Sequence, residues 1–465
     1  MKVILPVVIL LAGCAVKLPE RGRVAPDYPA QWQVAGTETS APMSSWWRQF
    51  GDTTLNGLVE EALEKNHDLQ AAAARMEQGR LRAAIAGAES LPQLNTSIEG
   101  NRQRNNFIGL PFPGASGVLT SRSESYRFSL STSWELDLWG RIRSGHLAEV
   151  AESDAARTDF VATKLSLAAQ TIKAWLRLTE ARQQEDYAQV NVVLIGSTTK
   201  QMRVRYELGI QPALDLRLAE ANLATAGARA EQWHAAREQA QRQLEVLLGR
   251  YPSGRLVEQT TLPELLPVVP VGLPSDLLIR RPDLNAARTR LLASDVRILQ
   301  AQAELYPKIS LTASGGTSSD ELESLMNNNF SIWSLGANLF QPVFSGGRLR
   351  ANVKMAKAKA AESVMQYRSV VLSAFSEVES ALAMNGAYKE REARLASAEE
   401  KARGALRLAE NRYERGVESF MTILDTQRRL IEIQSQRVAV RRIRLENRVN
   451  LHLALGGGFE DGGTQ

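Results

Sequence analysis

A long amphipathic strand that runs on into a proline-free helix constrains this chain more than any other feature. From Tyr126 to Leu138 every even position is apolar or Thr and every odd position is polar, the alternation of a β-strand with one apolar face. From Arg141 to Leu208 the chain has no proline, and small or apolar residues recur at helical spacing. A helix of that length extends about 100 Å at ~1.5 Å per residue. Such a helix suits a conduit better than a compact domain.

A seven-residue grid of mostly small or apolar side chains runs along this helix and along a second one further down the chain. This spacing is typical of helices that pack side by side along a seam, and small side chains allow a close approach around a hollow. The first seam is Ala155, Ala162, Ala169, Leu176 and Val190, interrupted by Gln183, and the second is Tyr367, Ala374, Ala381, Tyr388, Leu395, Ala402 and Ala409.

The chain also repeats itself. Matched segments near the short helices are separated by 215 residues, and matched segments from the long helices onward are separated by 207 residues. Two offsets, each held at several positions, predict an internal duplication with an insertion or deletion in the hairpin loop. The matches include Asn66–Ala72 with Arg281–Ala287, Pro92 with Pro307, Gly140 with Gly347, and Arg205–Gly209 with Arg412–Gly416.

We expect the following organisation from these patterns. Asp52 is predicted to cap the first helix, Asn66 to break it, and Asn105–Ser123 to form a loop between the first two strands. The expected segments are a signal peptide (1–13), an extended N-terminal arm (14–45), a first repeat (46–250) with a β-hairpin at about 94–138 and a helical hairpin at about 141–249, a linker (251–274), a second repeat (275–458) with a β-hairpin at about 308–344 and a helical hairpin at about 348–456, and a tail (459–465).

Cys14 is the only cysteine of the chain and follows a short apolar run that reads as a signal peptide. Leu11-Ala-Gly-Cys14 resembles the lipobox of bacterial lipoproteins, in which the cysteine becomes the acylated N-terminus. Ala15 is not the aspartate that typically retains such lipoproteins in the inner membrane. A chance match within a signal peptide that is cut elsewhere is the alternative reading.

The charge balance argues against nucleic acid as a partner. The 56 basic residues nearly match the 51 acidic ones, so the formal net charge is only +5. An excess this small is not the basic footprint of a protein that binds nucleic acid.

The four predicted strands set the fold class. Each repeat supplies two of them, and four strands are too few to close a barrel, since about eight is the usual minimum. An open sheet edge in lipid leaves backbone groups unsatisfied. We therefore expect an α+β membrane protein in which three chains associate cyclically into a 12-stranded β-barrel, continuous with a long α-helical barrel.

Sequence motifs along nearly the whole chain resemble those of the outer membrane factors, the TolC-like family, and are most similar to the OprM/CusC-type (NodT-type) efflux lipoproteins. They are Trp46-Trp47 with Phe50-Gly-Asp52, Glu61-Ala-Leu63, Asn66, Asp68-Leu69, Leu91-Pro-Gln-Leu94, Trp134-Glu-Leu-Asp-Leu-Trp-Gly-Arg141, Arg280-Arg-Pro-Asp-Leu284, Tyr306-Pro-Lys-Ile309 and Leu455-Gly-Gly-Gly458.

This resemblance implies a homotrimeric channel-tunnel, with its β-barrel in the lipid of the Gram-negative outer membrane and its helices in the periplasm. It also implies a passive exit duct for drugs or other small toxic compounds. An inner-membrane pump of the RND type would deliver them through a periplasmic adaptor (membrane fusion) protein. It implies no enzymatic activity, cofactor or metal.

The resemblance assigns roles to residues at the periplasmic end. Gly209 and Gly416 become the tip turns, where a helix C-terminus favours glycine because its left-handed conformation costs little. Asp215 and Tyr413 fall on positions that tether neighbouring helices closed. Glu418 stands where some members carry a tether arginine, so the latch of this chain is expected to differ in part.

Asp425 and Thr422 fall on the paired aperture positions of the family, which are both acidic in some members. A carboxylate at a narrow neck attracts cations and can be titrated or bridged by metal. The resemblance therefore predicts a resting channel that conducts poorly and favours cations. The alternative reading of Asp425 is a solvated acid on a helix surface.

An enzyme is the first rival interpretation, and no motif supports it. The four histidines, His67, His146, His234 and His452, have no partners at metal-ligand spacing. Gly346-Gly347 lacks the lysine of a phosphate-binding loop, and no nucleophile elbow is present.

Two further interpretations are also consistent with the long helices. A lipid-anchored periplasmic coiled coil explains Cys14 but not the four amphipathic strands at matched positions of the repeats. An exit channel for type I secretion of peptides has the same fold, and the sequence leaves it open because the pump selects the cargo.

Overall fold

The computed structural model describes residues 24–33, 45–107, 119–256, 261–264, 269 and 271–457. The predicted signal peptide, the predicted lipidation residue Cys14 and the predicted tail lie outside these residues. The described chain forms two compact units, and the division between them falls within four helices. The first unit is built mainly from Glu77–Ala155 and Ala287–Gln366, and the second mainly from Ala25–Met76, Ala156–Ala286 and the chain from Tyr367 onward.

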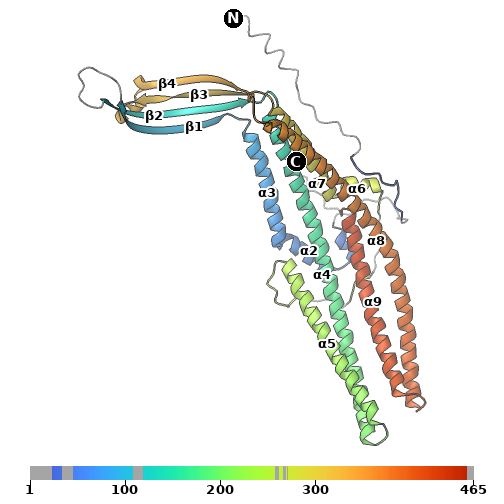
Figure 1. Cartoon of the computed structure of the whole chain (residues 1–465). Coiled ribbons are helices and arrows are strands. Elements are labelled where there is room, and N and C mark those ends of the chain that lie inside the picture. Colours follow the sequence, from blue (N-terminus) through green and yellow to red (C-terminus); the bar gives the residue numbers. More distant parts are fainter. Residues whose placement is uncertain are drawn as a thin grey trace. The chain divides into compact units, whose positions relative to one another are not determined.

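The first unit contains one antiparallel sheet in the order β1-β2-β3-β4, with β1 and β4 as its outer strands (Figure 1). Two short 3-10 turns, η3 and η4, join β3 to β4. The strands are β1 (Gln93–Phe107), β2 (Leu119–Leu136), β3 (Lys308–Ser319) and β4 (Ser331–Phe340), and the turns are Leu322–Met326 and Asn328–Phe330.

The register of this sheet separates apolar from polar side chains. Trp134 lies opposite Leu311, which in turn lies opposite Ala337, so side chains of one polarity share a face. On the other face Ser97 and Ser129 lie opposite each other, with their hydroxyl oxygens 2.9 Å apart. The sheet therefore has one apolar face and one face rich in hydroxyl groups, as the period-2 pattern predicted.

The first hairpin is longer than the sequence predicted. Asn105 pairs with Ser121, and Phe107 pairs with Leu119, so both ends of the expected loop at 105–123 are strand and that boundary is wrong. Apart from the pair of Phe107 and Leu119, these segments are polar on both faces and carry no apolar alternation, but the backbone pairing continues through them. At the other ends β2 stops at Leu136 and β4 at Phe340, before the predicted Leu138 and Phe344.

The helices confirm the predicted long elements. α4 and α8 each have 67 residues, and α5 and α9 each have 35. None of the helices in the described ranges has an apolar stretch long enough to cross a membrane. The elements are η2 (Trp46–Phe50), α2 (Thr53–Lys65), α3 (His67–Ala88), α4 (Arg141–Glu207), α5 (Ala213–Leu247), α6 (Pro274–Arg280), α7 (Pro282–Ala303), α8 (Arg348–Glu414) and α9 (Phe420–Ala454).

Asp52 caps α2 as predicted, because its carboxylate accepts a hydrogen bond of 3.0 Å from the backbone N–H of Leu55. Its second oxygen accepts from the indole N–H of Trp175 at 2.9 Å, which ties the cap to α4. Asn66 separates α2 from α3, also as predicted, and its side chain caps α3 by accepting from the backbone N–H of Leu69 at 3.0 Å.

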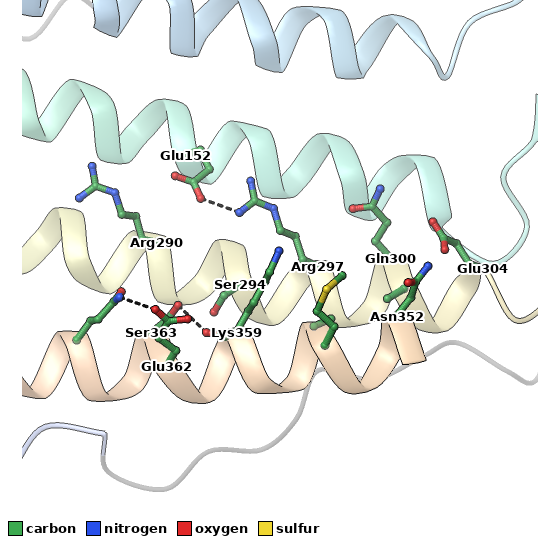
Figure 2. A pocket seen from close by; sticks show the side chains of 14 residues that line it. Glu152, Arg290, Ser294, Arg297, Gln300, Glu304, Asn352, Lys359, Glu362 and Ser363 are labelled. Atoms are coloured by element: carbon green, nitrogen blue, oxygen red, sulfur yellow. Dashed lines mark hydrogen bonds and ion pairs between the residues drawn. The ribbon is translucent and has the colours of Figure 1, made fainter. Parts of the chain in front are cut away.

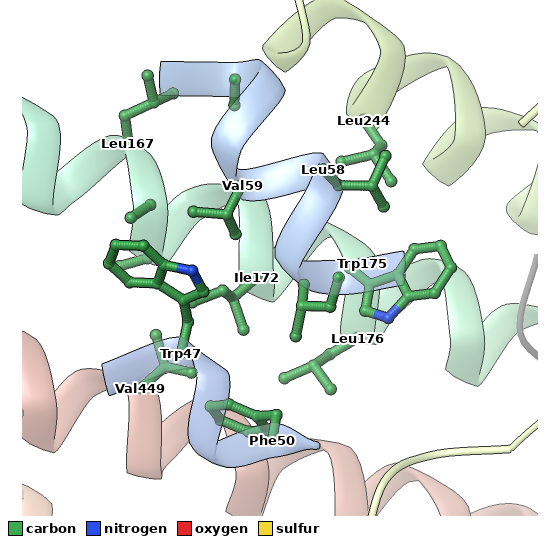
Figure 3. Close-up of a cluster of buried hydrophobic side chains, with 14 of the residues drawn as sticks. Trp47, Phe50, Leu58, Val59, Leu167, Ile172, Trp175, Leu176, Leu244 and Val449 are labelled. Atoms are coloured by element: carbon green, nitrogen blue, oxygen red, sulfur yellow. The ribbon is translucent and has the colours of Figure 1, made fainter. Parts of the chain in front are cut away.

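The core of the second unit forms around the aromatic residues of η2. Figure 3 shows Trp47 and Phe50 facing Ile172 and Leu176 of α4, with Val449 of α9 beside them. These side chains are all nine-tenths or more buried, and full burial of one large apolar side chain contributes about 1.5–3 kcal/mol. The Trp-Trp motif is therefore the packing centre between two helices that are far apart in sequence.

The predicted seams are largely buried, with one error. Val190 is 65% exposed, because from Ala181 onward the buried face of α4 continues through Ala188, Ile195 and Met202. There α4 packs beside α5: the hydroxyl of Thr199 reaches the carbonyl of Ala219 at 3.2 Å. The heptad count alone does not predict this shift of the buried face.

Candidate functional site

The two helical hairpins of the second unit end in turns of the same backbone geometry. Gly209 and Gly416 both have φ of 74°, and a Cβ at either position would have no atom within 4 Å. Glycine is therefore required by the left-handed backbone and not by lack of space. Each turn closes with the paired hydrogen bonds of a Schellman motif: Ile210 N–H binds the Arg205 carbonyl at 2.9 Å, and Val417 N–H binds the Arg412 carbonyl at 3.0 Å.

Tyr413 connects the two hairpins. Its hydroxyl oxygen accepts hydrogen bonds from Arg205 Nη1 and from Gln211 Nε2, both at 3.2 Å. The Arg205 guanidinium also lies 5.3 Å from the centre of the Tyr413 ring, a cation–π geometry. The ring packs against Phe420 with centroids 6.0 Å apart. One side chain of α8 is thus held by residues at the end of α4 and before α5.

An apolar cluster surrounds this junction and involves all four helices of the two hairpins. Tyr413 packs against its edge, half-buried. Its buried members are Met202 of α4, Leu216 and Ala219 of α5, Ala402, Leu406 and Ala409 of α8, and Phe420, Ile423 and Leu430 of α9.

Asp215 does not meet Tyr413 within one chain. It lies half-buried in the first turn of α5, where the helix dipole favours a negative charge. Among the described residues its carboxylate forms no hydrogen bond or ion pair. The two predicted tether residues therefore have different surroundings: Tyr413 is bound by Arg205 and Gln211, which the sequence did not single out, whereas Asp215 has no such contact within the described residues.

Glu418 and Thr422 form a local network at the start of α9. Glu418 pairs with Arg412 at 3.2 Å and accepts a hydrogen bond from the Thr422 hydroxyl at 2.9 Å. The Thr422 hydroxyl also lies 3.0 Å from that of Ser419, the N-cap residue. The Thr422 hydrogen bond, together with the Ser419 N–H and the Arg412 charge, lowers the pKa of Glu418. Glu418 thus connects the end of α8 to the start of α9 within the same hairpin.

Asp425 lies one turn further along α9 and is paired on its own helix. Arg428 Nη2 is 2.7 Å and Arg429 Nη2 is 3.3 Å from its carboxylate oxygens, the i+3 and i+4 spacing at which helix side chains meet. The hydrogen bonds from Arg428 and then Arg429 lower the pKa of Asp425. Within one chain these two arginines and one aspartate carry a net charge of +1, and the predicted role of Asp425 at an aperture stays a prediction.

The first unit has a groove along α7, between α4 and α8, with a volume of about 520 Å³. Figure 2 shows Arg297 of α7 reaching toward Glu152 of α4, and Arg297 Nη1 lies 2.9 Å from Glu152 Oε1. Arg290 and Lys359 lie along the same groove with Glu304 and Glu362. Cations and carboxylates balance, so the groove offers no concentrated charge for a charged ligand.

No group of three or more His, Cys, Asp or Glu side chains suited to a metal ion occurs in the part of the chain that the structure describes. His234 lies 2.8 Å from Glu185, in an ion-pair cluster with Arg237. His452 stacks on Trp46 with ring centroids 4.7 Å apart, and burial lowers the pKa of this histidine to about 3. These histidines occupy packing and ion-pair positions.

Comparison with known proteins identifies the family. The sequence profile described as Outer membrane efflux protein matches residues 58–250 and 273–457. The chain belongs to this family. The efflux protein is therefore an outer membrane component of an efflux system, in a family of channels and not of enzymes.

Individual relatives agree along almost the full length. The efflux protein is 34% identical over 471 residues to the pyoverdine export outer membrane protein OpmQ of Pseudomonas putida, covering 98% of this chain and 97% of the relative. It is 31% identical over 471 residues to the toluene efflux pump outer membrane protein TtgF of Pseudomonas putida, covering 98% and 96%. It is similar to the open state of the Neisseria gonorrhoeae MtrE outer membrane channel, with a TM-score of 0.83, 29% identity, and 96% and 98% coverage.

Proposed function

We propose that three copies of the efflux protein form a 12-stranded β-barrel continuous with a helical barrel, and that this trimer is the exit duct of a tripartite efflux pump. One observation carries the proposal: an open four-stranded sheet with one apolar face leads directly into two helices of 67 residues. The described residues of β1 are nearly all exposed and those of β4 are all exposed. Both edges therefore need a partner strand in lipid.

We also infer that the chain arose by internal duplication, with repeats at 46–250 and 275–458. Side-chain donors at matched positions bind carbonyl oxygens at matched positions, although the donor residues differ in type. Such conserved contacts between unlike residues are expected when two copies keep one backbone. The matched pairs are Asn66 with Leu247 (2.9 Å) and Arg281 with Ala454 (3.0 Å), and Trp134 with Ser90 (2.9 Å) and Gln341 with Leu305 (3.2 Å).

The proposed cargo is small toxic organic compounds, and the proposed partners are an inner-membrane pump of the RND type and a periplasmic adaptor. The relatives named for pyoverdine export and toluene efflux support an organic cargo. A passive duct needs no site for chemistry.

We propose that the two tips form the periplasmic gate of this duct. Tyr413 and Asp215 are its proposed tether residues, Asp425 and Thr422 line its proposed aperture, and Gly209 and Gly416 form its turns. In this arrangement Tyr413 holds the two hairpins of one chain together through Arg205 and Gln211. Asp215 would then bind a group of the neighbouring chain.

Lipidation at Cys14 is the last part of the proposal. The described stretch 24–33 supports an arm that follows the second unit: Tyr28 and Trp32 pack against Phe375 of α8, with ring centroids 5.5 and 6.1 Å away. The Trp32 indole N–H donates to the Gly272 carbonyl at 3.0 Å. An arm fixed in this way would connect the helices to an acyl anchor.

Three measurements test the proposal. The mass of the detergent-solubilised protein should be that of a trimer, and the protein should form conducting channels in planar bilayers. A stable monomer with full strand content would contradict the trimeric barrel. The intact mass of the purified chain should show acyl groups on Cys14, and a mature chain without them removes the lipid anchor but leaves the channel.

A further inference from the structure

The β1–β2 hairpin extends past the rest of the sheet. Pairing of β2 with β3 ends at Tyr126 and Ser319, whereas pairing of β2 with β1 continues to Leu119 and Phe107. Residues 119–125 of β2 therefore pair with β1 alone among the described strands. A two-stranded ribbon is marginally stable by itself in water, so this extension needs support from its surroundings.

The extension carries all its charges on one face. Even-numbered positions of β1 and β2 share one face of the sheet, as Gly100 opposite Tyr126 illustrates. This face is apolar in the body of the sheet and bears the charges in the extension. The opposite face is uncharged, with amides and hydroxyls up to the terminal pair of Phe107 and Leu119, and the 108–118 segment of the sequence has no charged residue. The charged face bears Arg102, Arg104, Arg122 and Glu124, and the neutral face bears Asn101, Gln103, Asn105, Ser121, Ser123 and Ser125.

Three arginines face a single acid on this surface, an excess of two positive charges. Arg102 and Glu124 are opposite each other and form an ion pair of 2.9 Å. Arg104 and Arg122 are also directly opposite each other, and neither has an ion pair within the described ranges. Like charges at directly opposite positions destabilise a strand pair. An anion bound between Arg104 and Arg122 would therefore stabilise this part of the hairpin.

The position along the strand indicates where that anion comes from. Arg102 follows Ile98 by four residues, about 13 Å along a strand at ~3.4 Å per residue. Ile98 is apolar and 71% exposed, on the face that the proposed barrel turns toward lipid. The arginines therefore lie beyond the apolar band, at the depth of lipid headgroups, and at the hairpin end remote from the strand ends that join the helices.

We propose that Arg104 and Arg122, with Arg102 beside them, bind phosphate groups of membrane lipids that surround the barrel. Guanidinium groups bind phosphate oxygens in pairs of parallel hydrogen bonds, and an anion between the two strands would relieve the repulsion of Arg104 and Arg122. The inference rests on the proposed barrel, because only that arrangement gives the charged face to lipid and the neutral face to the lumen.

Native mass spectrometry of the detergent-solubilised full-length protein tests the proposal, with diphosphorylated lipid A as the probe. The parent should retain this lipid, and retention should fall about ten-fold or more in the double variant Arg104→Gln/Arg122→Gln, because one charge-assisted contact is worth at least that factor. Arg104→Lys/Arg122→Lys keeps both charges and should recover part of the binding. Arg127→Gln is the matched control, because Arg127 lies on the opposite face of β2 and is paired in register with Glu99. This variant should retain lipid A like the parent.

Three outcomes overturn the inference. They are equal retention by the double Gln variant, equal retention of lipid A without its phosphates, and full displacement by inorganic phosphate at low millimolar concentration, which would indicate a soluble-anion site. Bilayer conductance of the same samples separates this inference from the proposed function. Trimers that conduct but do not bind the lipid phosphates would contradict only this inference. A protein that never inserts into the bilayer would contradict the proposed barrel as well.

Discussion

The tips of the two helical hairpins have the same backbone and different side-chain contacts. Both glycines have φ of 74°, and both turns close with the same hydrogen bonds. Tyr206 in the first tip is 43% exposed, and its hydroxyl forms no hydrogen bond among the described residues. Tyr413 at the matching position receives hydrogen bonds from Arg205 and Gln211. The shared turn sets the shape, and the side chains that differ decide which tip binds the other.

The helices that follow the two turns also differ. α9 begins with a side-chain cap, because Ser419 Oγ accepts from the backbone N–H of Thr422 at 3.3 Å. α5 begins after Pro212, which has no side-chain cap. One turn further along, the second hairpin carries Asp425. The matching residue of the first hairpin, 207 positions earlier, is Leu218. The first hairpin has its own ion pairs, of Glu220 with Arg203 and Arg217, so the two hairpins differ in the side-chain cap and in the positions of their charges. A functional difference between them is testable by matched substitutions.

The largest expected difference comes from the two tyrosines. Tyr413→Ala removes three hydrogen bonds, including one that its hydroxyl donates to Met202 Sδ. It also removes the Phe420 contact and the Arg205 stacking, and should destabilise the tip by about 2 kcal/mol. Tyr206→Ala should change it by less than about 0.5 kcal/mol. Amide hydrogen exchange across the ends of α4 and α8 measures both effects. Equal effects in the two variants would show that the tips are not distinguished by the Tyr413 junction.

The turns themselves should respond alike. Gly209→Ala and Gly416→Ala each place a Cβ on a left-handed residue, which costs about 1 kcal/mol, and open space around both positions excludes a steric difference. Hydrogen exchange at the adjacent helix ends should increase by a similar factor in both variants. A much larger effect at Gly416 would mean that the second turn carries strain beyond its backbone angle.

The charge at the second hairpin should control ion selectivity if the proposed aperture is correct. Arg428 and Arg429 outnumber Asp425, so the parent should favour anions weakly, and Asp425→Asn should strengthen that preference. Arg428→Gln/Arg429→Gln should reverse it toward cations. Reversal potentials in a salt gradient measure the change. The matched control is Leu218→Asn on the first hairpin, which should leave selectivity unchanged. Identical reversal potentials in all variants would place the constriction elsewhere.

The smallest expected effect is a pH dependence confined to one tip. The pKa of Glu418 is lowered by its hydrogen bond from Thr422, so its stabilising contribution is complete above the ordinary glutamate pKa. It is lost as the pH falls through the lowered value in the folded protein. Gln211, at the matching position of the first tip, cannot titrate.

Exchange of the Ser419 and Thr422 amides should therefore rise on acidification, while exchange around Gln211 changes little. Glu418→Gln should remove the dependence. If this variant keeps the parent's pH response, another group near the tip is responsible.

Much of the architecture could be predicted from sequence because its signals are local. Alternation at period two marks the strands, and the absence of proline marks the long helices. The capping side chains of Asp52 and Asn66 divide the first helices. The pairing of Asp425 with Arg428 and Arg429 is also local, since i+3 and i+4 neighbours meet on any helix. The sequence therefore also contains the two arginines that pair with Asp425.

Other features depend on which segments meet in space, and no local pattern contains them. The partners of Tyr413 within the chain, Arg205 and Gln211, are more than 200 positions away in the sequence, so no local pattern singles them out. The buried face of α4 shifts along the helix and leaves Val190 exposed. The first hairpin lengthens because backbone groups of two polar segments pair with each other. Local periodicity determines each element, but the partner of a side chain is set by the burial that tertiary packing creates.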